Sequence, residues 1–339
     1  MITASPLGAS LSCPPPDFAP EQAAKAAMQH FGLTGVLSPL TSERDVNYLL
    51  RADRGAFVLK LANPAEAAQV TQFQTGALLH LEASDLPVPR VIRSLTGATD
   101  VALPQGIFRV LTYLEGEIMH RAAPSAVLRA QMGQMTARLA LGLAGFDHPG
   151  ADHVLQWDIQ RASALRPLLA DLPRDLHPLG LAVLNRFDDQ IAPALPALRA
   201  QVLHNDLNPH NIVVSGHPAR VTGILDFGDM VRTPLVCDLA VTASYLVETE
   251  DPLTCLTQFC AAYHATLPLT APEATLVIAL TETRWLTTLC IAHHRAARYP
   301  DNAAYILRNV PRARAGLLAF AGLDRAGAQE KFLKDLRLT

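Results

Sequence analysis

The pattern of apolar and polar residues in the first third of the chain predicts a small sheet. Between residues 35 and 63, apolar runs alternate with turns, and "DRG" at 53–55 is a hairpin turn before the strand "FVLKL". The later runs "VPRVIRS" and "IFRVLTYLEG" predict two more strands. A helix that closes at Gly32 precedes this mainly antiparallel sheet, and a second helix, with Pro64 near its first turn, is inserted in it.

After a polar break at 115–117, the pattern takes a helical period. Residues 124–146 carry an apolar stripe that predicts core packing, formed by Leu128, Met132, Met135, Leu139 and Leu143. Residues 177–198 and 235–320 are also helical in pattern, with the strand-like runs "NIVVSG" and "RVTGILDFG" between them. We therefore predict an α+β fold of two lobes: a poorly ordered tail at 1–18, a β-rich lobe at 19–114 and a larger, mainly helical lobe at 115–339.

Composition narrows the class of protein. The 339 residues are 50% hydrophobic, and the net charge of −3 predicts neither a nucleic-acid surface nor a polybasic membrane patch. The pattern predicts no signal peptide, and no uninterrupted apolar run reaches the roughly 18 residues of a membrane span. Five cysteines without a CxxC pair indicate free thiols, and "CIAHH" at 290–294 is interpreted as a helix face rather than a metal site. We expect a cytoplasmic monomer or homodimer without nucleic-acid or membrane partners.

Two polar stretches and one lysine match the requirements of phosphoryl transfer. "HNDLNPHN" contains Asp206 and Asn211, and the later "ILDFGD" supplies Asp226, while Lys60 ends an apolar strand and is the only lysine between residues 26 and 330. A lysine on a rigid strand can hold the α- and β-phosphates of a nucleotide. Mg²⁺ prefers oxygen ligands, which Asn211 and Asp226 offer. Asp206 is then left to accept the proton of an acceptor hydroxyl, and two short strands joined by a turn would bring these groups to one cleft.

These motifs carry a resemblance to a known family. Residues 40–300 resemble the aminoglycoside phosphotransferase and choline kinase group, which has a protein-kinase-like fold, through "HNDLNPHNIVV", "VTGILDFGDMVRTPLVCDLAV", "SERDVNYLL" and "WD" at 157–158. Within that group the chain is most similar to hydroxylysine kinases. The resemblance implies that Asp206 is the catalytic base, that Asn211 and Asp226 bind Mg²⁺, and that His204 holds the loop. It also implies ATP or GTP as donor, favouring GTP, with nucleotide contacts from Lys60, Ser42, Arg44, Asn47, Tyr113 and Glu115.

One position departs from the family pattern. The helix glutamate that usually pairs with the lysine is expected at Gln72, and Glu66, nearer the helix start, is the alternative. If neither carboxylate serves, a catalytically weak nucleotide-binding protein is a rival to an active kinase. A kinase of protein side chains and a nucleotidyl transferase are further rivals, although "DFGDM" followed by "TPLVCDLA" favours a small acceptor.

The acceptor is expected to be a hydroxyl-bearing amino compound, cationic or zwitterionic. Carboxylates for an ammonium group are expected from Asp229, Glu248 and Glu282, and Arg284 and Arg232 could hold a carboxylate. Trp157 with Asp158 could form a wall of the site, although interlobe packing explains Trp157 equally well. This set suits 5-hydroxylysine; homoserine, choline, ethanolamine and aminoglycosides are the alternatives. Two neighbours are assigned to structure: Asp238 as a brace to the catalytic loop and His210 as a loop residue.

Overall fold

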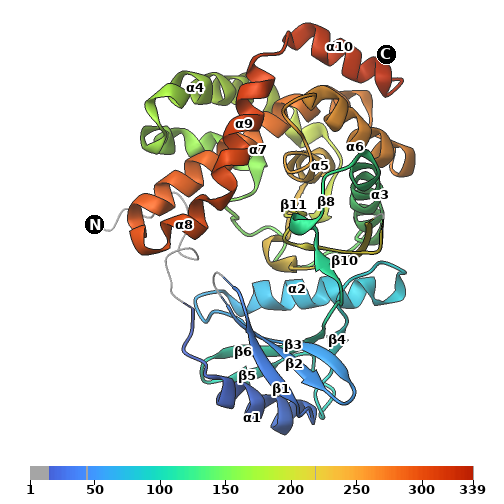
Figure 1. The fold of residues 1–339 in the computed structure, drawn as a ribbon, viewed down its shortest axis with the longest axis vertical. Coiled ribbons are helices and arrows are strands. Elements are labelled where there is room, and N and C mark those ends of the chain that lie inside the picture. Colours follow the sequence, from blue (N-terminus) through green and yellow to red (C-terminus); the bar gives the residue numbers. More distant parts are fainter. Residues whose placement is uncertain (1–14, 43–44, 218, 339) are drawn as a thin grey trace.

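The computed structural model describes residues 15–42, 45–217 and 219–338 and has the two predicted lobes (Figure 1). The strands are β1 Val36–Leu40, β2 Val46–Ala52, β3 Gly55–Leu61, β4 Val91–Ile92, β5 Val101–Leu103, β6 Gly106–Thr112, β7 Glu117–Ile118, β8 Ala200–Leu203, β9 Ile212–Ser215, β10 Arg220–Ile224 and β11 Val231–Pro234. The α-helices are α1 Pro20–Phe31, α2 Ala68–His80, α3 Ala126–Gly142, α4 His177–Arg186, α5 Leu235–Ala243, α6 Pro252–Thr266, α7 Ala271–Arg298, α8 Ala303–Ile306, α9 Val310–Ala321 and α10 Arg325–Asp335.

The small lobe is an antiparallel sheet in the order β1-β2-β3-β6-β4, with β5 beside β6. Helix α1 lies on one side of this sheet, and α2 runs along the other side, facing the helical lobe (Figure 1). The register places Lys60 of β3 between Asn47 of β2 and Arg109 of β6. Because directly opposite residues point to the same face of a sheet, the two cations emerge side by side.

Two details of the small lobe correct the sequence prediction. Phe18, assigned to the end of a poorly ordered tail, is buried and packs edge-on against Phe108 at 5.8 Å between ring centroids. The inserted helix begins at Ala68 rather than near Pro64, since residues 64–67 form a turn. This four-residue delay changes which side chains the helix directs toward the sheet.

The large lobe is built around α7. By length and composition α7 could cross a membrane, but 83% of its apolar window is buried inside the fold, so it is a core helix. The predicted stripe of α3 is confirmed, since its five residues are all buried. Helix α3 packs closely on α6 at Gly133, where a Cβ atom would lie 2.2 Å from the carbonyl oxygen of Phe259.

Three short strand pairs carry the polar stretches. β9 pairs with β10, with Ile212 opposite Ile224, and β7 adds to the other edge of β9. β8 pairs with β11, which follows the DFG turn. The Leu225 amide donates to the Asn211 carbonyl at 2.7 Å, so the ends of the two polar stretches lie next to each other.

The cysteine prediction agrees with the described residues. Cys237, Cys255, Cys260 and Cys290 are free and buried, and Cys13 lies outside the described part of the chain. In "CIAHH", His294 pairs with Asp171 at 2.6 Å. The described residues contain no cluster of three or more His, Cys, Asp or Glu side chains able to hold a metal.

Candidate active site

Asp206 lies in the loop between β8 and β9, with both carboxylate oxygens engaged. One oxygen accepts from the side-chain amides of Asn208 and Asn211, at 2.8 and 2.9 Å. The other lies 3.5 Å from the guanidinium of Arg284. Burial, reinforced by nearby Asp229, raises the pKa of Asp206 to about 7 against the lowering effect of Arg284. A base with its pKa near neutrality suits proton transfer from an alcohol.

The catalytic loop is held from behind by His204 and Asp238. His204 is fully buried; its Nε2 lies 3.0 Å from the Leu225 carbonyl, and its Nδ1 accepts from the Asp206 amide at 3.3 Å. Burial lowers the pKa of His204, which suits this neutral pairing. Asp238 of α5 accepts from the Asn205 amide at 2.6 Å, and Asn205 has a positive φ of 61°. The contacts of both side chains are therefore those of a scaffold.

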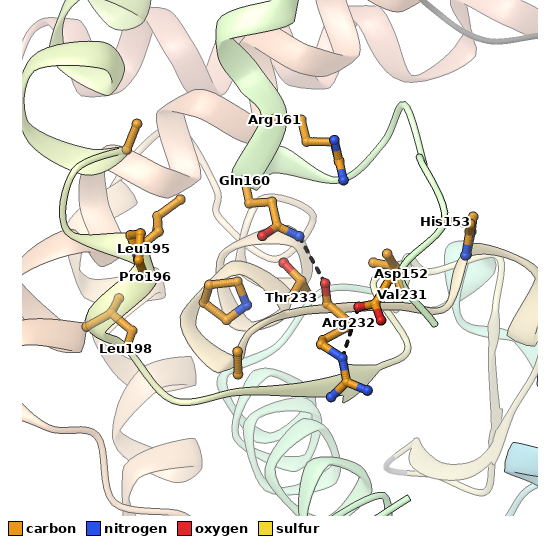
Figure 2. Close-up of a pocket in the computed structure, with 13 residues that line it drawn as sticks. Asp152, His153, Gln160, Arg161, Leu195, Pro196, Leu198, Val231, Arg232 and Thr233 are labelled. Atoms are coloured by element: carbon orange, nitrogen blue, oxygen red, sulfur yellow. Dashed lines mark hydrogen bonds and ion pairs between the residues drawn. The ribbon is translucent and has the colours of Figure 1, made fainter. Parts of the chain in front are cut away.

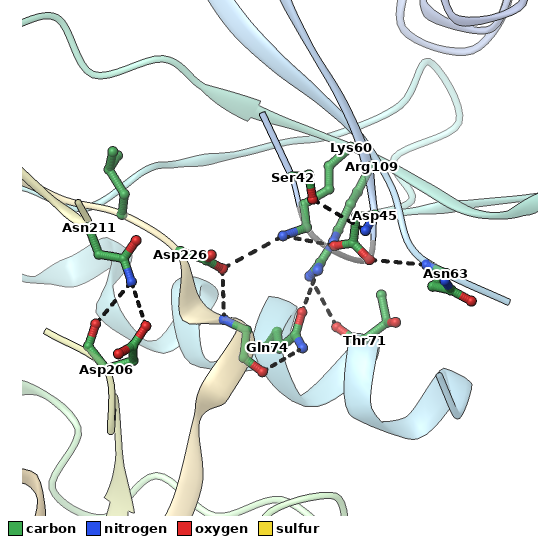
Figure 3. Close-up of polar contacts among 12 residues, drawn as sticks. Ser42, Asp45, Lys60, Asn63, Thr71, Gln74, Arg109, Asp206, Asn211 and Asp226 are labelled. Atoms are coloured by element: carbon green, nitrogen blue, oxygen red, sulfur yellow. Dashed lines mark hydrogen bonds and ion pairs between the residues drawn. The ribbon is translucent and has the colours of Figure 1, made fainter. Parts of the chain in front are cut away.

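Asn211 and Asp226 fit a divalent cation. Asn211 uses its amide nitrogen on Asp206, which leaves the amide oxygen as the group available to a ligand (Figure 3). The side chain of Asp226 is 54% exposed, and one of its oxygens accepts from the Gly228 amide at 3.1 Å. Asp226 also has a left-handed backbone, with φ of 55°, which turns this carboxylate out of the strand. Two oxygen donors beside a phosphate site are the protein ligands that Mg²⁺ typically takes.

Lys60 pairs with a residue that the sequence did not single out. Its ammonium lies 3.0 Å from Asp45 and 3.8 Å from Asp226 (Figure 3). Burial lowers the pKa of Lys60, but Asp45 and Asp226 together outweigh it and hold the pKa above its usual value. The lysine is therefore charged, and it lies next to Asp226, one of the two expected metal ligands.

The expected helix partner is absent from its predicted place. Gln72 is exposed on α2, and the buried glutamine of that helix is Gln74. The side-chain oxygen of Gln74 accepts from Arg109 at 2.5 Å, and its side-chain nitrogen contacts the Gly228 carbonyl at 3.4 Å. This side chain therefore bridges the sheet and the turn of the DFG motif (Figure 3). The assignment of Gln72 to the nucleotide site was wrong. Glu66 contacts Thr71 and Gln74 at the start of the helix.

The structure describes four of the other residues expected to contact the nucleotide. Ser42 accepts from the Asp45 amide at 3.2 Å, and Asn47 lies opposite Lys60. At the interlobe connection, exposed Glu115 pairs with Arg51 at 3.0 Å, and Arg51 also lies over the ring of Tyr113. Arg44 lies outside the described residues. The nucleotide roles of Ser42, Asn47, Tyr113 and Glu115 remain predictions.

A pocket of about 80 Å³ opens beside the catalytic carboxylate. Both acidic and basic residues line it, together with polar and apolar ones: Trp157, Asp206, Asn208, Asp229, Tyr245, Arg284, Thr288, Ala292, Arg295, Ile306, Arg308 and Asn309. Arg284 is 2% exposed and lies between the rings of Trp157 and Tyr245, at 5.2 and 5.8 Å. It also donates to the Trp157 carbonyl, so it is a fixed part of the wall.

Arg232, a predicted substrate residue, belongs to a different and larger cavity. That cavity, of about 420 Å³, has Arg232 on its wall with Asp152, whereas Asp206 is not among its lining residues (Figure 2). Arg232 pairs with Asp147 and, at 3.0 Å, with Asp152. The size of this cavity does not make it the acceptor site, because Asp206 and the two expected metal ligands are not among its lining residues. The assignment of Arg232 was therefore wrong.

Three acidic residues predicted for the acceptor site make their contacts outside this pocket. Asp158 is 1% exposed and accepts from Thr233 at 3.0 Å and from the Gln160 amide, so it fastens the start of the segment Ile159–Asp171 to β11. Glu282 is fully buried between Arg186 and Arg325. Glu248 pairs with Arg129 at 3.1 Å. None of these three carboxylates lines the pocket beside Asp206, whereas Asp229 does.

Eight lining residues were not singled out from the sequence, and four of them concern the proposed chemistry: Asn208, Tyr245, Arg295 and Arg308. Asn208 lies within the catalytic motif and could have been chosen from it. The other three come from the helical region, where side chains of one stripe look alike in sequence. Only the packing of α7 against its neighbours brings Arg295 and Arg308 to the same opening as Asp206.

Comparisons with known proteins identify the family. Residues 36–275 match the model of the phosphotransferase enzyme family. The chain belongs to this family. It is 28% identical to a hydroxylysine kinase of Danio rerio, over 93% of this chain and 94% of that protein. In fold it is similar to an amicoumacin kinase solved with AMP-PNP and Ca²⁺ (TM-score 0.68, 13% identity, covering 91% and 97%) and to a microcompartment-associated aminopropanol kinase (0.66, 19%, 93% and 99%).

The comparisons confirm several predictions about this phosphotransferase. The resemblance to the aminoglycoside phosphotransferase group and the bilobal kinase-like fold are both confirmed. So is the enzyme class, a kinase that phosphorylates a hydroxyl group of a small molecule. The amicoumacin kinase was solved with a nucleotide and a divalent cation, and for this chain a nucleotide donor and Mg²⁺ remain predictions. Monomer or homodimer, and a cytoplasmic location, remain predictions.

Proposed function

We propose that the chain transfers the γ-phosphoryl group of Mg-ATP or Mg-GTP to the hydroxyl of a small hydroxy amino acid, with 5-hydroxylysine as the first candidate. The observation that supports this most is the position of Asp206. Its carboxylate contacts Asn211, one of the two expected metal ligands, and it also lines a pocket that contains both acidic and basic residues. A zwitterionic acceptor would be neutralised at both ends in such a pocket.

Each group of the site has a step in this reaction. Lys60 binds the donor phosphates through the ammonium protons that Asp45 does not use. Asn211 and Asp226 would hold Mg²⁺, which would supply positive charge to the phosphate oxygens when bound. Asp206 accepts a hydrogen bond from the acceptor hydroxyl and orients it toward the γ-phosphorus. It takes the hydroxyl proton as the new P–O bond forms and the bond from the γ-phosphorus to the β–γ bridging oxygen breaks, which releases the nucleoside diphosphate. Asn208 and Asn211 fix the carboxylate for this contact.

The pocket walls support an acceptor with both an ammonium and a carboxylate. Asp229 offers a carboxylate near Asp206 for the ammonium group. Arg308 donates to the nearby Tyr305 carbonyl, and the described residues show no ion pair to its guanidinium. Its remaining donors suit a carboxylate, with Arg295 adding charge on the same wall. Arg308 and Arg295 thus take the carboxylate-binding role that was expected of Arg232.

The test is release of nucleoside diphosphate with Mg²⁺, crossing ATP and GTP with matched acceptors. 5-Hydroxylysine is compared with 1,5-diaminopentan-2-ol, and homoserine with 3-aminopropan-1-ol, because each pair differs only in the carboxylate. Choline, ethanolamine and kanamycin complete the panel, and Asp206→Asn is the control. We expect the amino acids to be used at least tenfold better, in kcat/KM, than their decarboxylated partners, as a bidentate Arg contact predicts.

The alternatives give different results. Equal use of a pair would remove the carboxylate from the specificity and favour an amino alcohol acceptor. Efficient turnover of kanamycin alone would indicate an aminoglycoside kinase. Nucleotide binding without turnover of any acceptor would favour the catalytically weak protein, and the Asp206→Asn control must abolish any acceptor-dependent release that is assigned to this site.

A further inference from the structure

The lysine of the nucleotide site has its counter-charge in an unusual place. In kinases of this fold the lysine on the third strand pairs with a glutamate of the helix that follows. Here the corresponding helix, α2, directs a neutral amide, Gln74, toward the site, and the oxygen of that amide is taken by Arg109. The helix therefore gives the lysine no carboxylate from this buried position.

Arg109 explains why a helix glutamine is sufficient. Its guanidinium is 2% exposed and donates to Gln74, to the Thr75 hydroxyl at 3.0 Å and to the Thr71 carbonyl at 3.3 Å (Figure 3). Arg109 thus fastens α2 to the sheet, which is the structural part of the usual lysine–glutamate contact. Since Arg109 lies opposite Lys60 in the register, the two buried cations repel each other, and Lys60 needs a carboxylate of its own.

Asp45 meets that need from the turn before β2. One of its oxygens lies 3.0 Å from the Lys60 ammonium, and the other accepts from the Asn63 amide at 3.1 Å. Its own amide donates to Ser42 at 3.2 Å. The side chains of Lys60 and Asp45 are only 14% and 16% exposed, so solvent screens the pair weakly. Asp226 is farther away, at 3.8 Å. Its carboxylate would bind the cation during turnover.

Resting on the proposed phosphate-binding role of Lys60, we propose that Asp45 is the positioning residue of this lysine, in place of a helix carboxylate. The ammonium has three protons, and Asp45 holds it by one. The others then point along a fixed direction to the donor phosphates. Because Asp45 lies directly before β2, this contact couples the lysine to the start of that strand and not to the position of α2.

A double-mutant cycle tests this role. The variants are Asp45→Asn, Lys60→Met and the double substitution, with Asp53→Asn as a matched control, since Asp53 is an exposed aspartate of the same lobe. Binding of Mg-ADP and Mg-GDP is measured by calorimetry, and KM is measured separately for nucleotide and acceptor. We expect Asp45→Asn to lower kcat/KM for the nucleotide by about 10- to 100-fold with an unchanged acceptor KM, and to have less than about a twofold further effect in the Lys60→Met background.

Three results would overturn the inference. Losses that multiply in the double variant would show that Asp45 acts independently of Lys60. Tighter nucleotide binding by Asp45→Asn would show that Asp45 competes with the phosphates. If Asp45→Asn does not fold, Asp45→Glu replaces it; full wild-type kcat/KM with the carboxylate moved by one methylene would equally overturn a positioning role. A wild-type chain that binds no nucleotide would overturn the proposed function and this inference with it.

Discussion

The brace behind the catalytic loop predicts a pH-dependent stability. Burial raises the pKa of Asp238 to about 7, although the Asn205 amide opposes this shift. In the unfolded chain the ordinary value is 3.8. The folded protein therefore binds a proton on Asp238 between these pH values that the unfolded chain does not. The contribution of Asp238 to stability is therefore most favourable at acid pH and becomes less favourable as the pH rises toward 7. Integrating this linkage gives about 2–3 kcal/mol between pH 5 and pH 8.

The perturbation is Asp238→Asn, which keeps an oxygen for the Asn205 amide but cannot titrate. The assay is thermal unfolding of the two proteins in matched buffers from pH 5 to pH 8, followed by circular dichroism. At roughly 1.4–2 °C per kcal/mol for a chain or lobe of this size, the wild type should gain about 3–5 °C over the variant on going from pH 8 to pH 5. Exposed Asp53→Asn should parallel the wild type.

A constant difference between the curves of wild type and Asp238→Asn, or a gain in the opposite direction, would refute a protonated Asp238. Asp238→Leu separates the hydrogen bond from the charge. It leaves the buried Asn205 amide without its acceptor, which costs about 1–3 kcal/mol at every pH. Because this amide precedes the catalytic aspartate, kcat should fall with Asp238→Leu more than with Asp238→Asn.

Three further predictions follow from packing and charge. Gly133→Ala should lower stability by about 1–3 kcal/mol in urea unfolding, because its Cβ meets the Phe259 carbonyl, whereas Gly322→Ala, whose Cβ has only ordinary contacts, should be neutral. Arg232→Met should leave the acceptor KM within about twofold of wild type; a large increase would return Arg232 to the acceptor site. Arg284→Met should lower kcat at pH 7 by about tenfold or more and shift the pH–rate profile upward, since the guanidinium lowers the pKa of the base; an unshifted profile would contradict this.

The parts of the site that are local in sequence were predictable. The motif around Asp206 and Asn211 lies in one loop, and antiparallel pairing of the neighbouring strands is enough to bring Asp226 beside it. The strand lysine was identified because lysine is scarce and because "FVLKL" has a clear strand pattern. The sheet and the helical lobe followed from their hydrophobic periods for the same local reason.

The position of α2 whose side chain faces the site was missed by two residues. A helix turns by about 100° per residue, so moving from position 72 to position 74 reverses the face. The late start of α2 at Ala68 hid the phase, since Pro64 suggested an earlier first turn. Asp45 was not identifiable from its turn, because its distance from Lys60 depends on the register of β2 and β3. The acceptor arginines likewise depended on how α7 packs, which no local pattern records.

The scarcity of lysine has a practical consequence for chemistry at this site. The chain's other three lysines, Lys25, Lys331 and Lys334, lie far from residue 60 in the sequence. An amine-directed affinity label carried by a nucleotide would therefore meet one side-chain amine in the whole stretch from 26 to 330. Arginine cleavage sites flank that position at Arg54 and Arg90, so the tagged peptide can be isolated and its occupancy counted directly. The lysine that is proposed to hold the phosphates is therefore also a selective site for covalent labelling.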